Sequence, residues 1–119
     1  MVLSFKQQFV DKILRKEKIH TIRKDPHDRW KAGMKIQFAT GVRTKNYCQF
    51  HDAICNGTQK IDIRYTMRSI TVRIDGVPIS RLKEFSLALN DGFPSVPAFY
   101  RLFNKDFSGK IIHWTDFRY

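Results

Sequence analysis

Residues 47–79, YCQFHDAICNGTQKIDIRYTMRSITVRIDGVPI, carry the strongest structural signal in the chain. They contain three runs rich in β-branched, aromatic or alternating apolar residues, at 47–55, 60–66 and 70–74. The dipeptide Asn56-Gly57 separates the first two runs, and Asn-Gly is the strongest two-residue signal for a β-hairpin. Asp75-Gly76 is a second turn signal, after which the chain returns through Val77 to Ile79. The centre of the chain is therefore predicted to form an antiparallel meander.

Helical patterns lie on both sides of this centre. Residues 5–16 place apolar side chains at the 3.6-residue period of an amphipathic helix, and Ser4 is a suitable N-cap. Residues 81–90 form a second helical segment with an apolar stripe of Leu82, Phe85 and Leu89, and Leu87 lies near it. Gly92 is expected to end that helix in a left-handed conformation. Ser95, followed by Pro97 in the first turn, predicts a third helix.

Shorter extended segments complete the pattern. Residues 19–23, 34–40 and 110–115 are predicted to be strands because they are short and rich in β-branched or aromatic residues. Strands in the middle, helices near both ends and a returning last strand favour an α+β fold. The sheet is expected to be small and closed or nearly closed.

The length and composition favour one domain over residues 1–119. A chain of 119 residues can bury roughly two-thirds of its unfolded surface, which is enough for a core without metal or disulfide. No apolar run approaches the ~20 residues that a membrane span needs. The first residues lack the apolar stretch of a signal peptide. We therefore expect a cytoplasmic protein with no membrane partner.

The charge points to a polyanionic partner. The chain has 22 Lys and Arg against 11 Asp and Glu, a formal charge of +11, and most of the excess lies in residues 1–50. A small domain this basic attracts polyanions, of which nucleic acid is the commonest. A positive surface that serves only solubility is the alternative.

A metal site is not expected. Cys48, His51 and Cys55 have a spacing that resembles three zinc ligands. In a strand, however, Cys48 and His51 point to opposite faces, and His51 and Cys55 lie roughly 13 Å apart. A structural zinc site also needs a fourth ligand. We predict reduced cysteines, no metal and no cofactor.

The segment that could carry chemistry begins at Lys18. In a strand, Ile19, Thr21 and Arg23 share one face, but Lys18 and Thr21 can meet if Lys18 lies in the preceding turn. A lysine, a hydroxyl and a carboxylate can form a nucleophilic site: the threonine attacks, the lysine accepts its proton and the carboxylate orients the lysine. From the residues alone, an ordinary strand threonine and a solvated turn lysine are the commoner interpretation.

Several short motifs resemble those of the ASCH domain in the PUA-like superfamily. The match includes Glu17-Lys18-Ile19-His20-Thr21-Ile22-Arg23 and, after a loop, Arg29-Trp30-Lys31-Ala32-Gly33-Met34. Near the C-terminus, Leu89-Asn90-Asp91-Gly92-Phe93 resembles the family's acidic-Gly-Phe turn, and Ile112-His113-Trp114-Thr115 resembles its closing strand. The motifs follow the family's order along nearly the whole chain.

This resemblance implies both a fold and a function. The implied fold is a β-barrel of about five to seven strands flanked by two or three helices. Family members have RNA-associated roles, and some short bacterial members are amidohydrolases that act on acetylated cytidine nucleosides. The catalytic lysine and threonine of those enzymes correspond to Lys18 and Thr21. Their acidic residue corresponds to Asp91, where this chain has aspartate in place of the usual glutamate.

Two main function hypotheses result, beside the simpler one of a cleft that binds a nucleotide or a modified base without chemistry. The first is an RNA-binding or RNA-processing domain whose basic cleft surrounds the Lys18-Thr21-Arg23 motif. Its phosphate contacts would be Arg23, Lys24, Arg29 and Lys31, and Trp30 or Trp114 would stack on a base unless these rings pack in the core. The second is an amidohydrolase that acts on a modified nucleoside such as N4-acetylcytidine, with Thr21 as nucleophile, Lys18 as base and Asp91 in support. His20 and His113 adjoin the matched motifs and are further candidates for the cleft.

Overall fold

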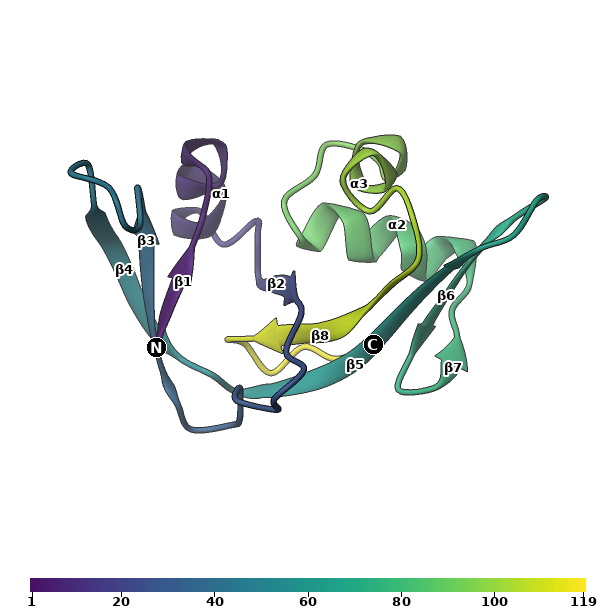
Figure 1. The fold of residues 1–119 in the computed structure, drawn as a ribbon, viewed down its shortest axis with the longest axis horizontal. Coiled ribbons are helices and arrows are strands. Elements are labelled where there is room, and N and C mark those ends of the chain that lie inside the picture. The colour runs from purple at the N-terminus through teal and green to yellow at the C-terminus, as the bar shows by residue number, and fades with distance from the viewer.

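The computed structural model describes all residues from 1 to 119 and contains two β-sheets and three α-helices (Figure 1). The larger sheet has the order β2 (His20–Arg23), β8 (Phe107–His113), β5 (Gly57–Tyr65), β6 (Ile70–Ile74) and β7 (Val77–Pro78). The smaller sheet has the order β1 (Val2–Ser4), β3 (Lys35–Thr40) and β4 (Cys48–Ile54). The helical segments are the 3₁₀ turn η1 (Gln7–Phe9) and the α-helices α1 (Val10–Leu14), α2 (Arg81–Asn90) and α3 (Val96–Leu102).

The expected β-barrel is wrong, because the two sheets stay separate and both are open. β2 and β7 are the edges of the larger sheet, and β1 and β4 are the edges of the smaller one. The chain passes from one sheet to the other within two residues: the Cys55 N–H donates to the Met34 carbonyl, and the Asn56 N–H donates to the His113 carbonyl. A barrel needs a continuous ladder of strand pairs, which this switch interrupts.

The predicted hairpin at Asn56-Gly57 is also wrong. β4 pairs with β3, whereas β5 pairs with β8 from Gly57 onward, so β4 and β5 are not partners. A type I′ hairpin requires positive φ at both central residues, and Asn56 does not have it. The second turn behaves as predicted, since Asp75 (φ 52°) and Gly76 (φ 82°) join β6 to β7. The central meander therefore consists of β5, β6 and β7.

Two hydrophobic clusters meet at β8. One lies between the larger sheet and the helices α2 and α3, and it includes Ile111. The other lies between the smaller sheet and α1, and it includes Ile112. Successive residues of a strand point to opposite faces, so neighbouring side chains of β8 serve different clusters. β8 and its partner β2 therefore lie at the junction of the two halves (Figure 1).

The helices differ from the sequence expectation in detail. Ser4 belongs to β1 and caps no helix, and the predicted helix over 5–16 is the short pair of η1 and α1. The second helix has the predicted span, but its stripe of Leu82, Phe85 and Leu89 is exposed and its buried residues are Leu87 and Ala88. Ser95 caps α3 as predicted, because its hydroxyl accepts the Ala98 N–H. None of the helices has the length and apolarity needed to cross a membrane.

Candidate functional site

A cavity opens beside β2, between the N-terminal segment and α3. Its volume is about 780 Å³, within the range typical of small-molecule sites. In Figure 1, β2 lies between α1 on one side and the α2–α3 pair on the other. All three residues predicted to be catalytic line this cavity, which we call the pocket: Lys18, Thr21 and Asp91.

A turn after α1 positions Lys18. Lys16 adopts a left-handed conformation (φ 64°), which ends the helix and reverses the chain. The N–H of Lys18 donates to the Lys12 carbonyl, and the N–H of Ile19 donates to the Asn90 carbonyl at the end of α2. Lys18 thus precedes β2, which begins at His20. This is the arrangement in which Lys18 and Thr21 were expected to face the same site.

Asp91 is the C-cap residue of α2. The residue that follows it, Gly92, lies where a side chain would be too close to its neighbours. Gly92 has φ 92°, a conformation that disfavours residues with a Cβ. A Cβ at Gly92 would lie 2.9 Å from Phe9 Cδ1 and 3.1 Å from Lys18 Cδ. The absence of a side chain at Gly92 therefore lets Lys18 and Phe9 lie against the end of α2. This brings the lysine to the carboxylate.

Lys18 and Asp91 form a buried pair. The Lys18 Nζ donates to the Asp91 main-chain carbonyl at 2.6 Å and to Asp91 Oδ1 at 3.0 Å. The two residues are only 2% and 3% exposed. Burial lowers the pKa of Lys18 below its usual 10.5, with a smaller contribution from nearby Arg23, while Asp91 opposes the shift. A lysine with a lowered pKa has the property that a general base requires.

Thr21 is buried next to Arg23. The register of β2 with β8 pairs Thr21 with Ile112, and Arg23, two residues on, shares its face. Arg23 Nε donates a hydrogen bond of 3.2 Å to the Thr21 hydroxyl oxygen. Burial also lowers the pKa of Arg23, but a guanidinium stays charged in proteins. A fixed positive charge therefore faces the candidate nucleophile.

A buried chain of hydrogen bonds lies behind Asp91, and sequence reasoning found only part of it. His20 Nδ1 lies 3.2 Å from Asp91 Oδ1, and His20 Nε2 contacts the Tyr119 hydroxyl, which also accepts from Asn90. Burial lowers the pKa of His20, so the ring is neutral near pH 7. Because a carboxylate only accepts, the proton lies on Nδ1 and the Tyr119 hydroxyl donates to Nε2. His20, which does not line the pocket, thus orients the Asp91 carboxylate.

His113 is also buried, and it does not line the pocket. Its Nε2 lies 3.0 Å from Gln59 Oε1, which also accepts the Tyr119 N–H, so Nε2 carries the proton. Its Nδ1 has no hydrogen-bond partner. Burial lowers the pKa of His113 to about 3. No three His, Cys, Asp or Glu side chains are grouped as a metal site needs, and Cys48 and Cys55 are both free.

The residues predicted to bind nucleic acid are divided between two places. Arg23 and Lys24 line the pocket, whereas Arg29, Trp30 and Lys31 do not. Trp30 is buried in the cluster beneath the smaller sheet, and Trp114 packs on Phe38 with ring centroids 4.8 Å apart. Both rings are therefore occupied by packing, which was the open alternative for them.

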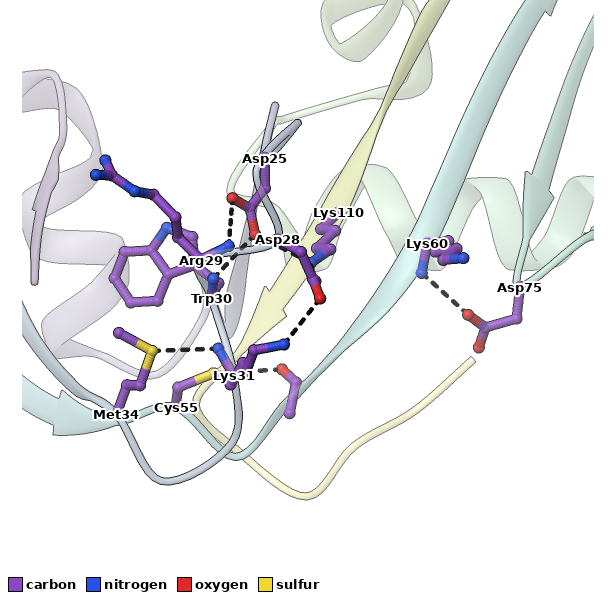
Figure 2. A network of polar contacts seen from close by, with 11 residues as sticks. Asp25, Asp28, Arg29, Trp30, Lys31, Met34, Cys55, Lys60, Asp75 and Lys110 are labelled. Carbon is purple, nitrogen blue, oxygen red and sulfur yellow. Dashed lines mark hydrogen bonds and ion pairs between the residues drawn. The ribbon is translucent and has the colours of Figure 1, made fainter.

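Arg29, Trp30 and Lys31 lie instead on the loop after β2, in a network of hydrogen bonds and ion pairs (Figure 2). Asp25 accepts the main-chain N–H groups of Arg29 and Trp30, each at 2.9 Å. Lys110 of β8 pairs with Asp25 at 3.0 Å and also with Asp28, which in turn pairs with Lys31 at 2.8 Å. We call Asp25, Asp28, Lys31 and Lys110 the loop cluster. It fixes the loop to the outside of the larger sheet.

Sequence reasoning missed much of the pocket wall. The lining residues not predicted are mainly aromatic or basic: Phe5, Lys6, Phe9, Phe93, Arg101, Phe103 and Phe107. Phe93 and Phe103 also belong to the hydrophobic cluster under α3. Apart from Phe93, which lies in a matched motif, no pattern distinguishes these residues from ordinary core or surface residues. Only the proximity of α3 to the N-terminal segment makes them part of one site.

Comparison with known proteins adds nothing to this description. No protein-family model matches the chain, and no match is found among curated proteins or solved structures.

Proposed function

We propose that this chain is a small amidohydrolase that removes the acyl group from an N4-acylated cytidine. The observation that carries the proposal is that Lys18, Thr21 and Asp91 line one pocket and that Lys18 is hydrogen-bonded to Asp91, which is distant in sequence. The motif resemblance to the ASCH domain supports it independently of the geometry. The shorter aspartate still lies 3.0 Å from the lysine amine, so the missing methylene does not separate the pair.

In the proposed first step, the Thr21 oxygen attacks the acyl carbonyl carbon. A neutral Lys18 amine has two hydrogens, and its two hydrogen bonds to Asp91 use both. The nitrogen lone pair then remains available to accept the Thr21 proton. Arg23 donates to the Thr21 oxygen, which favours the loss of the hydroxyl proton to Lys18. The bond from the carbonyl carbon to N4 breaks, Lys18 returns the proton to N4, and cytidine leaves.

The second step releases the acid. Water attacks the acyl-threonine ester, again with Lys18 as the proton acceptor. The ester bond breaks, the carboxylic acid leaves and Thr21 regains its hydroxyl proton. The sum is amide plus water giving carboxylic acid plus amine, so no oxidant, reductant or metal is needed.

The test measures cytidine release by mass spectrometry after incubation with N4-acetylcytidine. The matched variants are Lys18→Met, which removes the amine at similar volume, and Thr21→Val, which removes the hydroxyl. We expect turnover by the native chain and none above background by either variant, with both variants folded by circular dichroism. Folded native protein that releases no cytidine would disprove the proposal.

As a second function we propose RNA binding, supported by positive charge that continues beyond the pocket. Lys24 lines both the pocket and a smaller hollow of about 350 Å³, whose lining also includes Lys60. In the same hollow, Lys110 is already paired with Asp25 and Asp28. Lys24 and Lys60 therefore remain to contact a phosphate backbone.

Salt-dependent binding to single-stranded RNA tests this second function. Because phosphate contacts release counterions, affinity should fall steeply as salt rises. Lys24→Gln combined with Lys60→Gln should weaken binding and reduce the salt slope by about two. The pair Lys45→Gln and Lys83→Gln, which makes the same change in net charge outside both hollows, is the control. Equal losses in the two pairs would contradict a local RNA site.

A further inference from the structure

Three cations at the rim of the pocket take no part in the proposed chemistry. Lys6 follows β1, Lys24 follows β2, and Arg101 lies on α3, so three separate elements bring them to one cavity. All three side chains are exposed, and none makes a hydrogen bond or an ion pair within the chain. Their positive charge is therefore free to act on a ligand.

No acidic residue of the pocket lining is free to pair with these three cations. The only carboxylate of the lining is Asp91, which is buried and already bound by Lys18 and His20. Of the two other basic residues of the lining, Lys18 is bound to Asp91, and Arg23 donates to the Thr21 hydroxyl oxygen and the Ser4 carbonyl. Like charges around a hollow with low-dielectric walls focus a positive potential and concentrate anions there. The rim is thus suited to an anionic group that lies outside the reacting centre.

The aromatic part of the pocket lining is suited to a nucleobase. Phe5, Phe9, Phe93, Phe103 and Phe107 line the same cavity; Phe9 and Phe107 are only partly buried, whereas the other three belong to the packed core. Aromatic rings beside exposed cations form the combination that binds a nucleobase together with its phosphate. The volume of about 780 Å³ has room for both, whereas the amide chemistry uses only the end near Lys18.

We propose that the substrate is phosphorylated: the acylated cytidine carries a phosphate on its ribose, and Lys6, Lys24 and Arg101 bind that phosphate. The proposal rests on the amidohydrolase function above and specifies its substrate class. Arginine and lysine both bind phosphate through charge-assisted hydrogen bonds. A free nucleotide and a nucleotide within RNA present the same group.

The test begins with binding, which does not depend on turnover. Calorimetry compares cytidine with cytidine 5′-monophosphate on three proteins at low salt: the native chain, the rim variant Lys6→Gln/Lys24→Gln/Arg101→Gln, and the control variant Lys45→Gln/Arg68→Gln/Lys83→Gln. The side chains changed in the control are exposed and outside the pocket, and the loss of charge is the same. We expect the native chain to prefer the monophosphate by at least about tenfold. The control should keep this preference and the rim variant should lose it.

Three results would overturn the proposal: equal affinity of the native chain for the two ligands, a preference that survives in the rim variant, or a preference that is lost equally in the control. The second part compares turnover of N4-acetylcytidine, its 5′-monophosphate and a short oligonucleotide that contains one acetylcytidine. Faster turnover of the monophosphate assigns the phosphate to a free nucleotide, and faster turnover of the oligonucleotide assigns it to RNA. If no compound turns over while the monophosphate still binds at the rim, the amidohydrolase proposal fails and the phosphate site stands.

Discussion

Two lysine–aspartate clusters lie at β2 and β8, and the same residue types behave oppositely in them. In the pocket, Lys18 shares one carboxylate with His20, and burial lowers the pKa of the lysine. In the loop cluster, Lys110 has two carboxylates, and its hydrogen bond with Asp28 leads the interactions that raise its pKa, although burial opposes them. Lysine in the first cluster is suited to accept a proton, and lysine in the second is suited to hold a loop. The number of carboxylates and the access of water determine the difference.

The largest expected effect is on turnover, and it should occur when Lys18 is replaced but not when Lys110 is. Lys18→Met should reduce the turnover of an N4-acylated cytidine by on the order of 10²–10⁴-fold, because a general base contributes that much. Lys110→Met should leave the rate per folded molecule near that of the native chain. The measurement is kcat for both variants, corrected for the folded fraction. A loss of rate in Lys110→Met as large as that in Lys18→Met would remove the distinction.

The pH dependence of the reaction provides a second comparison. Only neutral Lys18 accepts a proton, so kcat/KM should rise as the pH rises through the lysine pKa, which burial has lowered. Asp91 favours the charged lysine and so raises this pKa. In Asp91→Asn the rising limb should therefore move to lower pH, together with a lower maximal rate. If the rising part of the kcat/KM profile moved to higher pH in Asp91→Asn, Lys18 would not be the group whose titration controls the rate.

The free energy of unfolding should fall when the loop cluster loses Lys110. Lys110→Met leaves the nearly buried Asp25 carboxylate without its cation, although its two main-chain hydrogen bonds remain. A hydrogen bond to a charged group contributes about 1.5–3 kcal/mol, and urea unfolding should show a loss of that size. Lys31→Gln is the matched control, because the Lys31–Asp28 pair is exposed and exposed pairs contribute little. Equal losses in the two variants would contradict the assignment of Lys110 as the main contact of the loop.

The smallest expected effect is at acid pH. Hydrogen bonds from Lys110 and Lys31 lower the pKa of Asp28 from 3.8 to about 2. A carboxyl with a lowered folded-state pKa stabilises the fold above its unfolded pKa, and this contribution is lost as the pH falls through the folded value. The free energy of unfolding should therefore fall between about pH 4 and pH 2, and less steeply in Asp28→Asn. If the free energy of unfolding fell equally steeply with pH in the native chain and in Asp28→Asn, the lowered pKa of Asp28 would be contradicted.

Local chemistry made much of the secondary structure predictable. The turn at Asp75-Gly76, the glycine after α2 and the Ser95 cap all act within a few residues, so their signals can be read from the chain. The Asn56-Gly57 signal failed because tertiary pairing overrides a local turn preference: β5 takes β8 and β6 as partners, and β4 takes β3. The barrel expectation failed with it, since the chain changes sheets at this dipeptide.

The sequence by itself determined the basic charge, the α+β composition, and the candidate residues Lys18, Thr21 and Asp91. Their assembly was decided only by the tertiary structure, because α2 ends against the turn before β2 and the Ile19 N–H bonds to the Asn90 carbonyl. The burial of Trp30, the exposure of the Leu82 face of α2 and the partnership of Asp91 with His20 were decided in the same way. A side chain's type and spacing are fixed by covalent order, whereas its solvent exposure and charge partners depend on segments distant in the chain. The lowered pKa of Lys18 depends on both.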